Sequence, residues 1–315
     1  MKFALVFPGQ GSQSVGMMAA YGDSPEIRHT FQEASDALGE DLWAMVADGP
    51  AERLSQTVNT QPLMLTAGVA VYRAWRAAGG PVPDIVAGHS LGEYSALVAA
   101  GAMAFADAVP LVRFRAAAMQ EAVPAGQGAM AALLGLDADA VVAVCAEVAE
   151  VAEGDVVEAA NLNAPGQIVI AGSSAAVERA MALAKTRGAK RAVLLPVSAP
   201  FHCALMKPAA DRLAERLASV AIQAPSIPVL NNVDVAVCND PVAIRDALVR
   251  QAYSPVRWIE SVAAIAAQGA AAVFECGPGK VLAGMTKRIA RDVQGAALAD
   301  EASLLESIAL VKENA

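Results

Sequence analysis

The stretch Asp84–Met103, DIVAGHSLGEYSALVAAGAM, places a serine between two glycines and then continues into an apolar, alanine-rich segment. Asp84 to Ala87 is typical of the end of a buried strand, and Glu93 to Ala100 is typical of a helix. The residues between them must form a sharp turn, in which two glycines relieve backbone crowding and Ser90 can adopt a strained conformation with an exposed hydroxyl. Two interpretations follow: a nucleophile beside the free N–H groups of a helix N-terminus, or a serine that only caps the helix.

Strand-like and helical runs alternate on both sides of this stretch. Such alternation is the signature of a doubly wound parallel sheet. The strand-like runs are FALVF (3–7), DIVAGH (84–89), PVLNN (228–232) and AAVFECG (271–277), and the helical runs include residues 24–39, 66–78 and 106–122.

The region from about residue 126 to 198 has a different order of elements. It predicts strand, helix, two strands joined by the turn APG, helix and strand, which is the βαββαβ order of a ferredoxin-like unit. We therefore predict an α/β fold with two domains. The large domain, with an α/β-hydrolase-like core and a parallel sheet, comprises residues 1–125 and 199–315, and the small ferredoxin-like domain, residues 126–198, is inserted into it.

The composition agrees with this architecture and narrows the function. Hydrophobic residues make up 56% and aromatic residues 4% of the 315 residues, as expected for helices packed on a parallel sheet that is apolar on both faces. The net charge of -9 argues against a nucleic-acid partner, because a polyanion needs a basic surface. The apolar runs are too short to span a membrane, and the start MKFALVFPGQG lacks a signal-peptide pattern. We therefore expect a cytoplasmic protein with no membrane partner.

Neither a metal site nor a nucleotide site is predicted. The four cysteines form no C-x-x-C pair, and only three histidines are present, so we expect reduced thiols and no zinc. The glycine-punctuated loop VFPGQGSQSVGM (6–17) lacks the G-K-[ST] and G-x-G-x-x-G patterns of nucleotide loops. It leaves the carboxyl end of a predicted parallel strand, as the Ser90 turn does, so it could donate N–H groups to an oxyanion beside that serine.

A nucleophilic serine needs a base, and a histidine is the usual one. His29 lies in a polar helical run, and His89 should point away from the side chain of its neighbour. His202 is therefore the candidate base, with a purely structural histidine as the alternative. The nearest downstream carboxylate is Asp211, on what should be the next helix. This spacing suggests a dyad whose imidazole is oriented by an amide or a backbone carbonyl.

Six motifs occur in order along the chain. They are FPGQGSQ (7–13), GHSLGEYSAL (88–97), NAPGQIVIAG (163–172), APFHCALM (199–206), QAYSPVRW (251–258) and FECGPGKVL (274–282). Together they closely resemble the malonyl-CoA:acyl carrier protein transacylases, in particular the free-standing bacterial enzymes of fatty acid synthesis. They are more distantly similar to the acyltransferase domains of polyketide synthases. The resemblance covers nearly the whole chain and implies an α/β-hydrolase-like core with a ferredoxin-like insert.

The resemblance also implies roles for individual residues. It matches the nucleophile of the family to Ser90 and the base to His202. The oxyanion donors of the family are backbone N–H groups that match Gln10 and Leu91. The residue that holds the imidazole, often through its main-chain carbonyl, matches Gln251.

The resemblance further predicts how the acyl group is selected. Helical spacing does not decide between Arg113 and Arg115, and the resemblance matches Arg115 to the arginine that grips a carboxylate through two parallel hydrogen bonds. Phe201 matches a position where phenylalanine accompanies malonyl selection over methylmalonyl in polyketide acyltransferases. Steric rejection of one methyl group is modest, about 1–3 kcal/mol. We also expect Met119 to contact the substrate.

The activity implied is ping-pong transfer of a malonyl group from malonyl-CoA to the phosphopantetheine thiol of acyl carrier protein. A coenzyme A thioester is then the substrate, and no separate cofactor is expected. Acyl carrier proteins are acidic, so docking on this acidic chain requires a local basic patch. We name two candidates, patch A (Lys185, Arg187, Lys190 and Arg191) and patch B (Lys280, Lys287, Arg288 and Arg291).

Three alternatives remain open from the sequence. A serine thioesterase or esterase would share the serine, the base and the oxyanion donors. An inactive homologue would only bind a carrier protein within a larger complex. The same transfer chemistry could also serve a malonate decarboxylase or a polyketide assembly line. We expect a monomer, since no apolar surface helix is evident.

Overall fold

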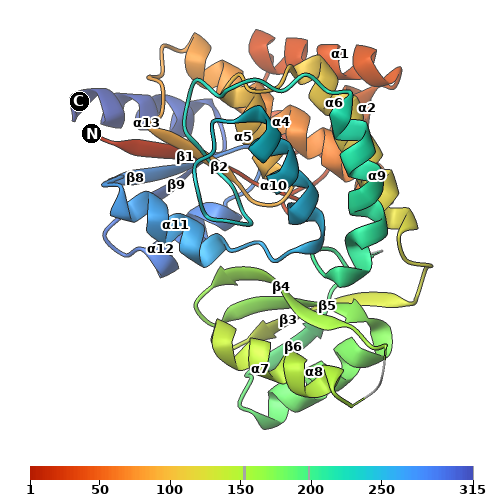
Figure 1. The fold of residues 1–315 in the computed structure, drawn as a ribbon. Coiled ribbons are helices and arrows are strands. Elements are labelled where there is room, and N and C mark those ends of the chain that lie inside the picture. Colours follow the sequence, from red (N-terminus) through yellow and green to blue (C-terminus); the bar gives the residue numbers. More distant parts are fainter. Residues whose placement is uncertain (152–153, 198, 315) are drawn as a thin grey trace.

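A five-stranded parallel sheet forms the centre of the large part of the molecule (Figure 1). The computed structural model describes residues 1–151, 154–197 and 199–314. The strand order is β7-β2-β1-β8-β9, and every neighbouring pair is parallel. This confirms the predicted sheet and adds β9, which the sequence analysis did not identify. The strands are β1 (Phe3–Phe7), β2 (Ile85–Gly88), β7 (Val229–Leu230), β8 (Ala272–Cys276) and β9 (Gln294–Leu298).

Helices connect and cover these strands. The helices of this part are α1 (Pro25–Leu38), α2 (Leu42–Asp48), α3 (Ala51–Leu54), α4 (Thr57–Ala77), α5 (Gly92–Ala99), α6 (Phe105–Glu121), α9 (Lys207–Ala218), α10 (Pro241–Tyr253), α11 (Trp258–Ala267), α12 (Val281–Ile289) and α13 (Glu301–Glu313), with short 3-10 turns η1 (Ala19–Tyr21) and η2 (Ala204–Met206). The helix predicted to begin at Thr66 begins at Thr57. Its first turns contain Pro62 and buried polar residues, so they lack the apolar pattern that identifies a helix.

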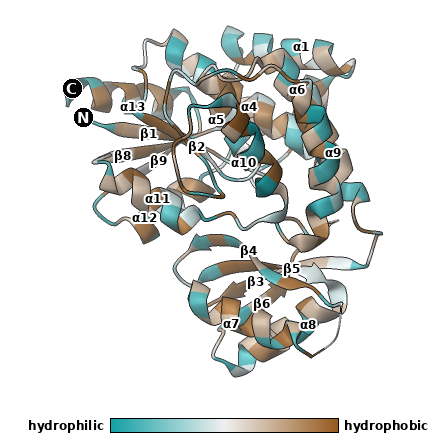
Figure 2. Ribbon diagram, in the orientation of Figure 1, coloured by the Kyte–Doolittle hydropathy of each residue, from teal (hydrophilic) through white to brown (hydrophobic). Residues whose placement is uncertain are grey.

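The sheet is buried on both faces, which makes three layers. All of β1 is buried, and its side chains alternate between two cores. Phe3, Leu5 and Phe7 pack in the cluster formed with helices such as α1, α4 and α6, whereas Ala4 and Val6 pack in the cluster formed with α11 and α12. The two groups of helices lie on opposite sides of the sheet in Figure 1, and the central strands β1 and β8 are among the most hydrophobic segments in Figure 2.

The second sheet is the predicted ferredoxin-like insert. Its order is β4-β5-β3-β6, all antiparallel, and two helices pack on one face. This confirms the βαββαβ unit. The domain limits 126–198 and 199–315 remain a prediction, because residue 198 lies outside the described residues. The elements are β3 (Gly128–Leu134), α7 (Ala138–Ala149), β4 (Val157–Ala164), β5 (Gln167–Ser173), α8 (Ser174–Thr186) and β6 (Arg191–Leu194).

The insert is joined to the rest of the protein by more than its two connecting segments. Leu162 on β4 donates its N–H to the carbonyl of Val256, and Val256 donates in turn to the carbonyl of Ala160, both at 2.9 Å. The face of the small sheet that α7 and α8 leave uncovered packs in one apolar cluster with Met119 of α6 and with Phe201. Among the described helices, none is both long and apolar enough to cross a membrane.

Candidate active site

Ser90 lies on a tight turn between β2 and α5, at the carboxyl edge of the parallel sheet. Its φ is 52°, a left-handed conformation that costs a non-glycine residue about 1–3 kcal/mol. A Cβ on Gly88 would lie 1.8 Å from the carbonyl carbon of Gly92, and a Cβ on Gly92 would lie 2.0 Å from the carbonyl oxygen of Phe7. Both glycines are therefore required by close backbone approach, as predicted, and the turn presents the strained serine at the edge of the sheet.

His202 lies on the return segment from the insert and meets Ser90 in space. The Oγ of Ser90 is 2.7 Å from Nε2 of His202, and Nδ1 of His202 is 2.8 Å from the main-chain carbonyl oxygen of Gln251 on α10. A carbonyl oxygen only accepts, so Nδ1 carries the proton and Nε2 of the neutral ring faces the serine as an acceptor. Burial, and secondarily the charge of Arg115, lower the pKa of His202 to about 3, which keeps the ring neutral near pH 7.

Arg115 extends from α6 to the same point. Its side chain is buried, with the residue 2% exposed, and Nη2 lies 3.3 Å from Oγ of Ser90. The other contacts of the guanidinium are neutral: Nη1 donates to Oε1 of Gln61 at 2.7 Å and Nη2 donates to Oε1 of Gln251 at 3.0 Å. Arg113 instead forms two hydrogen bonds to Glu40, so the structure places Arg115 and not Arg113 at the site.

Gln10 and Leu91, whose N–H groups are the predicted oxyanion donors, line the same cavity as Ser90. The loop after β1 carries Gln10, and its closeness to the Ser90 turn is shown by Gly9, where a Cβ would lie 2.5 Å from the carbonyl oxygen of His89. The side chain of Gln10 is held by a 2.6 Å hydrogen bond from Thr57. In the described part of the chain, no hydrogen bond engages the N–H of Gln10 or of Leu91.

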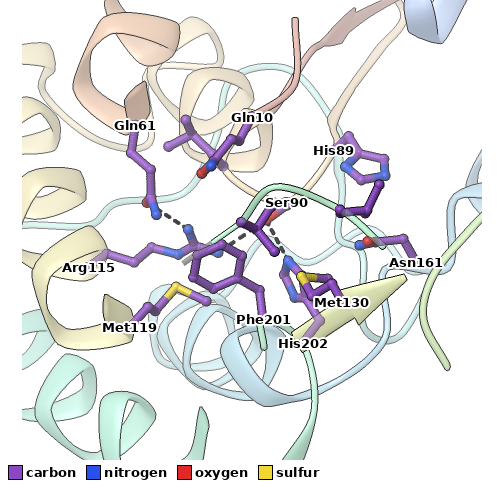
Figure 3. A pocket seen from close by; sticks show the side chains of 13 residues that line it. Gln10, Gln61, His89, Ser90, Arg115, Met119, Met130, Asn161, Phe201 and His202 are labelled. Carbon is purple, nitrogen blue, oxygen red and sulfur yellow. Dashed lines mark hydrogen bonds between the residues drawn. The ribbon is translucent and has the colours of Figure 1, made fainter. Parts of the chain in front are cut away.

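These groups surround a cavity of about 120 Å³ (Figure 3). Its apolar wall includes Met119, Phe201 and, from the insert, Met130. Its polar rim comprises the groups described above together with Gln61, His89 and Asn161. The cavity therefore combines a serine, a base, a cation and an apolar wall within one small volume.

The remaining sequence candidates lie elsewhere or have other partners. His89 bonds through Nε2 to Oδ1 of Asn163, 2.7 Å away, and its ring packs beside Trp258. His29 is exposed on α1, as expected. Asp211 is exposed on α9, so it does not orient His202, and the described residues contain no group of three or more side chains suited to a metal ion.

The sequence analysis did not identify Gln61, Met130 or Asn161 as parts of this cavity. Gln61 belongs to the polar first turns of α4 that did not resemble a helix, although its burial beside an arginine gives it an obvious role. Met130 and Asn161 reach the site from two strands of the insert, and the sequence carries no signal for which residues of a small domain face a distant turn.

A half-buried serine that lines a cavity on a strained strand-to-helix turn and is bonded to a buried neutral histidine is the arrangement of enzymes that transfer acyl groups through a serine ester. The family model of the acyl transferase domain matches residues 4–311. The chain belongs to this family.

Curated relatives and solved structures agree over nearly the full length. The malonyl CoA-acyl carrier protein transacylases of Salmonella typhimurium and Escherichia coli are 59% and 57% identical, over 96% and 98% of this chain and 97% and 99% of those proteins. An acyl-carrier-protein S-malonyltransferase from Burkholderia pseudomallei superposes with a TM-score of 0.96 at 63% identity, covering 98% of this chain and 100% of that one. A malonyl-transacylase in complex with a type II PKS acyl-carrier protein has a TM-score of 0.96 at 52% identity, with the same coverage.

Proposed function

We propose that this chain is an acyltransferase that moves a malonyl group from malonyl-CoA to the phosphopantetheine thiol of acyl carrier protein, and so supplies type II fatty acid synthesis. The names of the curated relatives and the six motifs support this function. One structural observation carries it: a buried guanidinium lies beside the nucleophilic serine and forms no ion pair with a described residue.

An unpaired buried cation is costly, because the low-dielectric interior replaces its hydration poorly. The amide oxygens of Gln61 and Gln251 satisfy two of the donors of Arg115, but both are neutral, and the buried carboxyl of Glu93 reaches the guanidinium only through the amide of Gln251. A carboxylate on the acyl group would supply a negative charge in direct contact and accept two parallel hydrogen bonds. A neutral acetyl group would not, so the site favours an acyl group that ends in a carboxylate.

The first half-reaction acylates the serine. Nε2 of His202 removes the hydroxyl proton as Oγ of Ser90 attacks the thioester carbonyl, and the N–H groups of Gln10 and Leu91 hold the tetrahedral oxyanion. The C–S bond breaks, and the coenzyme A thiolate takes the proton from His202. A malonyl-serine ester and free coenzyme A result. The main-chain carbonyl of Gln251 keeps the ring oriented and stabilises the imidazolium that forms in between.

The second half-reaction repeats these steps with another nucleophile. The thiol of the phosphopantetheine arm enters the cavity, loses its proton to His202 and attacks the ester carbonyl. Ser90 leaves and recovers the proton from His202. Arg115 anchors the malonyl carboxylate throughout, and the apolar wall around Met119 and Phe201 limits the space for the acyl group and for water.

The pathway served is a separate part of the proposal. One of the similar structures is a complex with a type II PKS acyl-carrier protein, so loading of a polyketide carrier is the second candidate. Comparing transfer to a fatty-acid carrier and to a polyketide carrier tests this choice. The cytoplasmic location and the monomeric state remain predictions.

The central test is the mass of the intact protein after brief incubation with malonyl-CoA. The wild type should gain one malonyl group, whereas Ser90→Ala should gain none. Addition of carrier protein with its pantetheine arm should then move the label to the carrier. Decay of the adduct to free malonate without loading of the carrier would instead identify a hydrolase, and absence of any adduct would identify an inactive homologue.

A further inference from the structure

Glu93 is a buried carboxyl group directly beneath the nucleophile turn, and the mechanism above does not use it. It lies in the first turn of α5, three residues after Ser90, and is 2% exposed. It forms no ion pair with a described residue. Instead, its Oε2 accepts two hydrogen bonds of 2.9 Å, from the main-chain N–H of Asn232 and from Nε2 of Gln251. These two partners lead to different halves of the site.

The first connection runs through Asn232 to the serine. The Oδ1 of Asn232 accepts from the N–H of Ser90 at 2.7 Å, and its Nδ2 donates to the carbonyl of Gly88, also at 2.7 Å. One carboxamide thus holds the backbone of the turn on both sides of His89. Because Ser90 has a positive φ, it keeps this conformation only if surrounding contacts impose it.

The second connection runs through Gln251 to the cation and the base. The Nε2 of Gln251 also donates to the carbonyl of Ser90 at 3.1 Å, while its Oε1 accepts from Nη2 of Arg115. Its main-chain carbonyl accepts from His202. One residue therefore touches the nucleophile turn, the guanidinium and the imidazole.

The carboxyl group fixes the orientation of this amide. An ionised carboxylate only accepts hydrogen bonds, so the end of Gln251 that faces Glu93 must be the NH₂ group. The opposite end, the Oε1, then faces Arg115, as observed. With the amide reversed, two donors would meet at Arg115 and two acceptors at Glu93. Burial is the main cause that raises the pKa of Glu93 to about 7, against the opposing effects of the hydrogen bonds from Gln251 and Asn232 and of the charge of Arg115, so the carboxylate form predominates at pH 8.

We propose that Glu93 is a positioning residue. Through Asn232 and Gln251 it fixes the position of the Arg115 guanidinium relative to the serine turn, and so sets the preference for an acyl group ending in a carboxylate. This inference rests on the proposed function. It differs from a general structural role in one measurable respect. Loss of the Glu93 carboxylate should harm transfer of malonyl more than transfer of a neutral acyl group, because only malonyl uses Arg115.

The test compares the rates at which malonyl-CoA and acetyl-CoA acylate Ser90 at pH 8 in the wild type and in Glu93→Gln. The mass of the intact protein is the readout. The matched control is Glu275→Gln, because Glu275 is a similarly buried carboxyl on strand β8, and its hydrogen bond goes to Ala283 and not to a residue of the site. We expect Glu93→Gln to reduce the malonyl-to-acetyl rate ratio by about tenfold or more, since a lost charge-assisted contact has that effect. Glu275→Gln should leave the ratio unchanged within about twofold.

A second variant covers a failure of Glu93→Gln to fold. Gln251→Met keeps the main-chain carbonyl that orients His202 but removes the amide between Glu93 and Arg115. It should lower the same ratio and leave the pH dependence of acetyl transfer unchanged. An unchanged ratio in either folded variant, or an equal loss for both acyl donors, overturns the proposal. If the wild type itself shows no preference for malonyl, the proposed function fails together with this inference.

Discussion

Arg115 acts on its surroundings as well as on the substrate, because its charge lies close to the base. After burial, this charge is the main cause of the lowered pKa of His202. His202 must be neutral to accept the serine proton, so a lower pKa extends activity to more acidic solutions. Binding of the malonyl carboxylate would neutralise the cation and strengthen the base only when the intended acyl group is present.

Replacement of Arg115 should therefore change the pH profile. In Arg115→Gln the pKa of His202 should rise part of the way towards its ordinary value, because burial still lowers it, so the acidic limb of the acylation rate should lie at a higher pH in the variant than in the wild type. The rate with acetyl-CoA is the appropriate measurement, because this donor has no carboxylate to bind the arginine. Arg113→Gln, two residues away and paired with Glu40, serves as the control. Identical profiles for the wild type and Arg115→Gln would contradict the coupling.

At this scale the sequence predicts residues whose type and spacing are unusual. Ser90 could be found from two flanking glycines, and His202 because only three histidines exist. Glu93, Asn232 and Gln61 could not be found in this way, since their partners lie far away along the chain. Asn232 did carry one usable signal: it is a polar residue two positions after a buried strand, and such residues gather at the carboxyl edge of a parallel sheet.

Among the elements, β8 and α12 are joined by a second buried carboxyl group. Oε2 of Glu275, near the end of β8, accepts from the N–H of Ala283 in the first turn of α12 at 2.9 Å. Its Oε1 has no hydrogen-bond partner in the described chain. Burial raises the pKa of Glu275 from 4.5 to about 7, with the opposing hydrogen bonds of the helix terminus too weak to prevent it.

The sign of the resulting pH dependence follows from proton binding. Because the folded state binds the proton of Glu275 more tightly, this group favours folding most below pH 4.5, and its contribution declines as the pH rises to about 7. In Glu275→Gln the dependence should disappear while the amide oxygen still accepts from Ala283. The free energy of unfolding of the variant, relative to that of the wild type, should therefore be higher at pH 8 than at pH 4 by on the order of 3 kcal/mol. Urea unfolding at both pH values measures this difference.

The matched substitution is Glu306→Gln, at an exposed position on α13. Its free energy of unfolding should differ from that of the wild type by the same amount at both pH values. A constant difference for Glu275→Gln as well would show that this carboxyl does not titrate between them.

Element prediction succeeded where burial leaves a pattern in the sequence. β1, β8 and α6 were located within one residue, because their runs are apolar or regularly amphipathic. The first turns of α4 were missed because their buried residues are polar and serve the active site. The alanine- and glycine-rich β9 was missed because QGAAL has few β-branched or aromatic residues.

For the molecule as a whole, docking of an acidic carrier protein is the largest remaining prediction. All eight cations of patches A and B are exposed. In patch A, Arg187 pairs with Glu147. Lys190 and Arg191 lie at the start of β6, and the same segment continues to Leu195 and Val197, which line the cavity. In patch B, Arg288 already donates to Pro165 and Gln167 of the insert. Patch A therefore offers charges on the segment that leads to the site.

We predict that reversing Lys190 and Arg191 to glutamate raises the KM for carrier protein by about tenfold, because charge complementarity speeds encounter. Acylation by malonyl-CoA should not change. The matched variant reverses Lys287 and Arg291 of patch B and should leave the KM nearly unchanged. The opposite result would place the carrier protein on α12. If neither pair changes the KM, neither patch binds the carrier protein.

The contact between the insert and the large sheet was beyond sequence reasoning. The order βαββαβ predicts that a ferredoxin-like unit exists, but not that β4 pairs with the segment around Val256. Nor does it predict that the uncovered sheet face meets Met119 and Phe201. Such contacts depend on how two separately stable surfaces fit, and neither surface carries a periodic pattern that identifies the other.

The position of the insert between nucleophile and base has a consequence for the newly synthesised chain. Ser90 precedes His202 by 112 residues, and His202 precedes the carbonyl of Gln251 by another 49. A ribosome-bound chain that has completed β2 and α5 carries the serine but neither of the groups that activate it. The serine of the unfinished chain is therefore not activated towards thioesters, and it becomes reactive only once the insert and the segments after it, with His202 and Gln251, have folded.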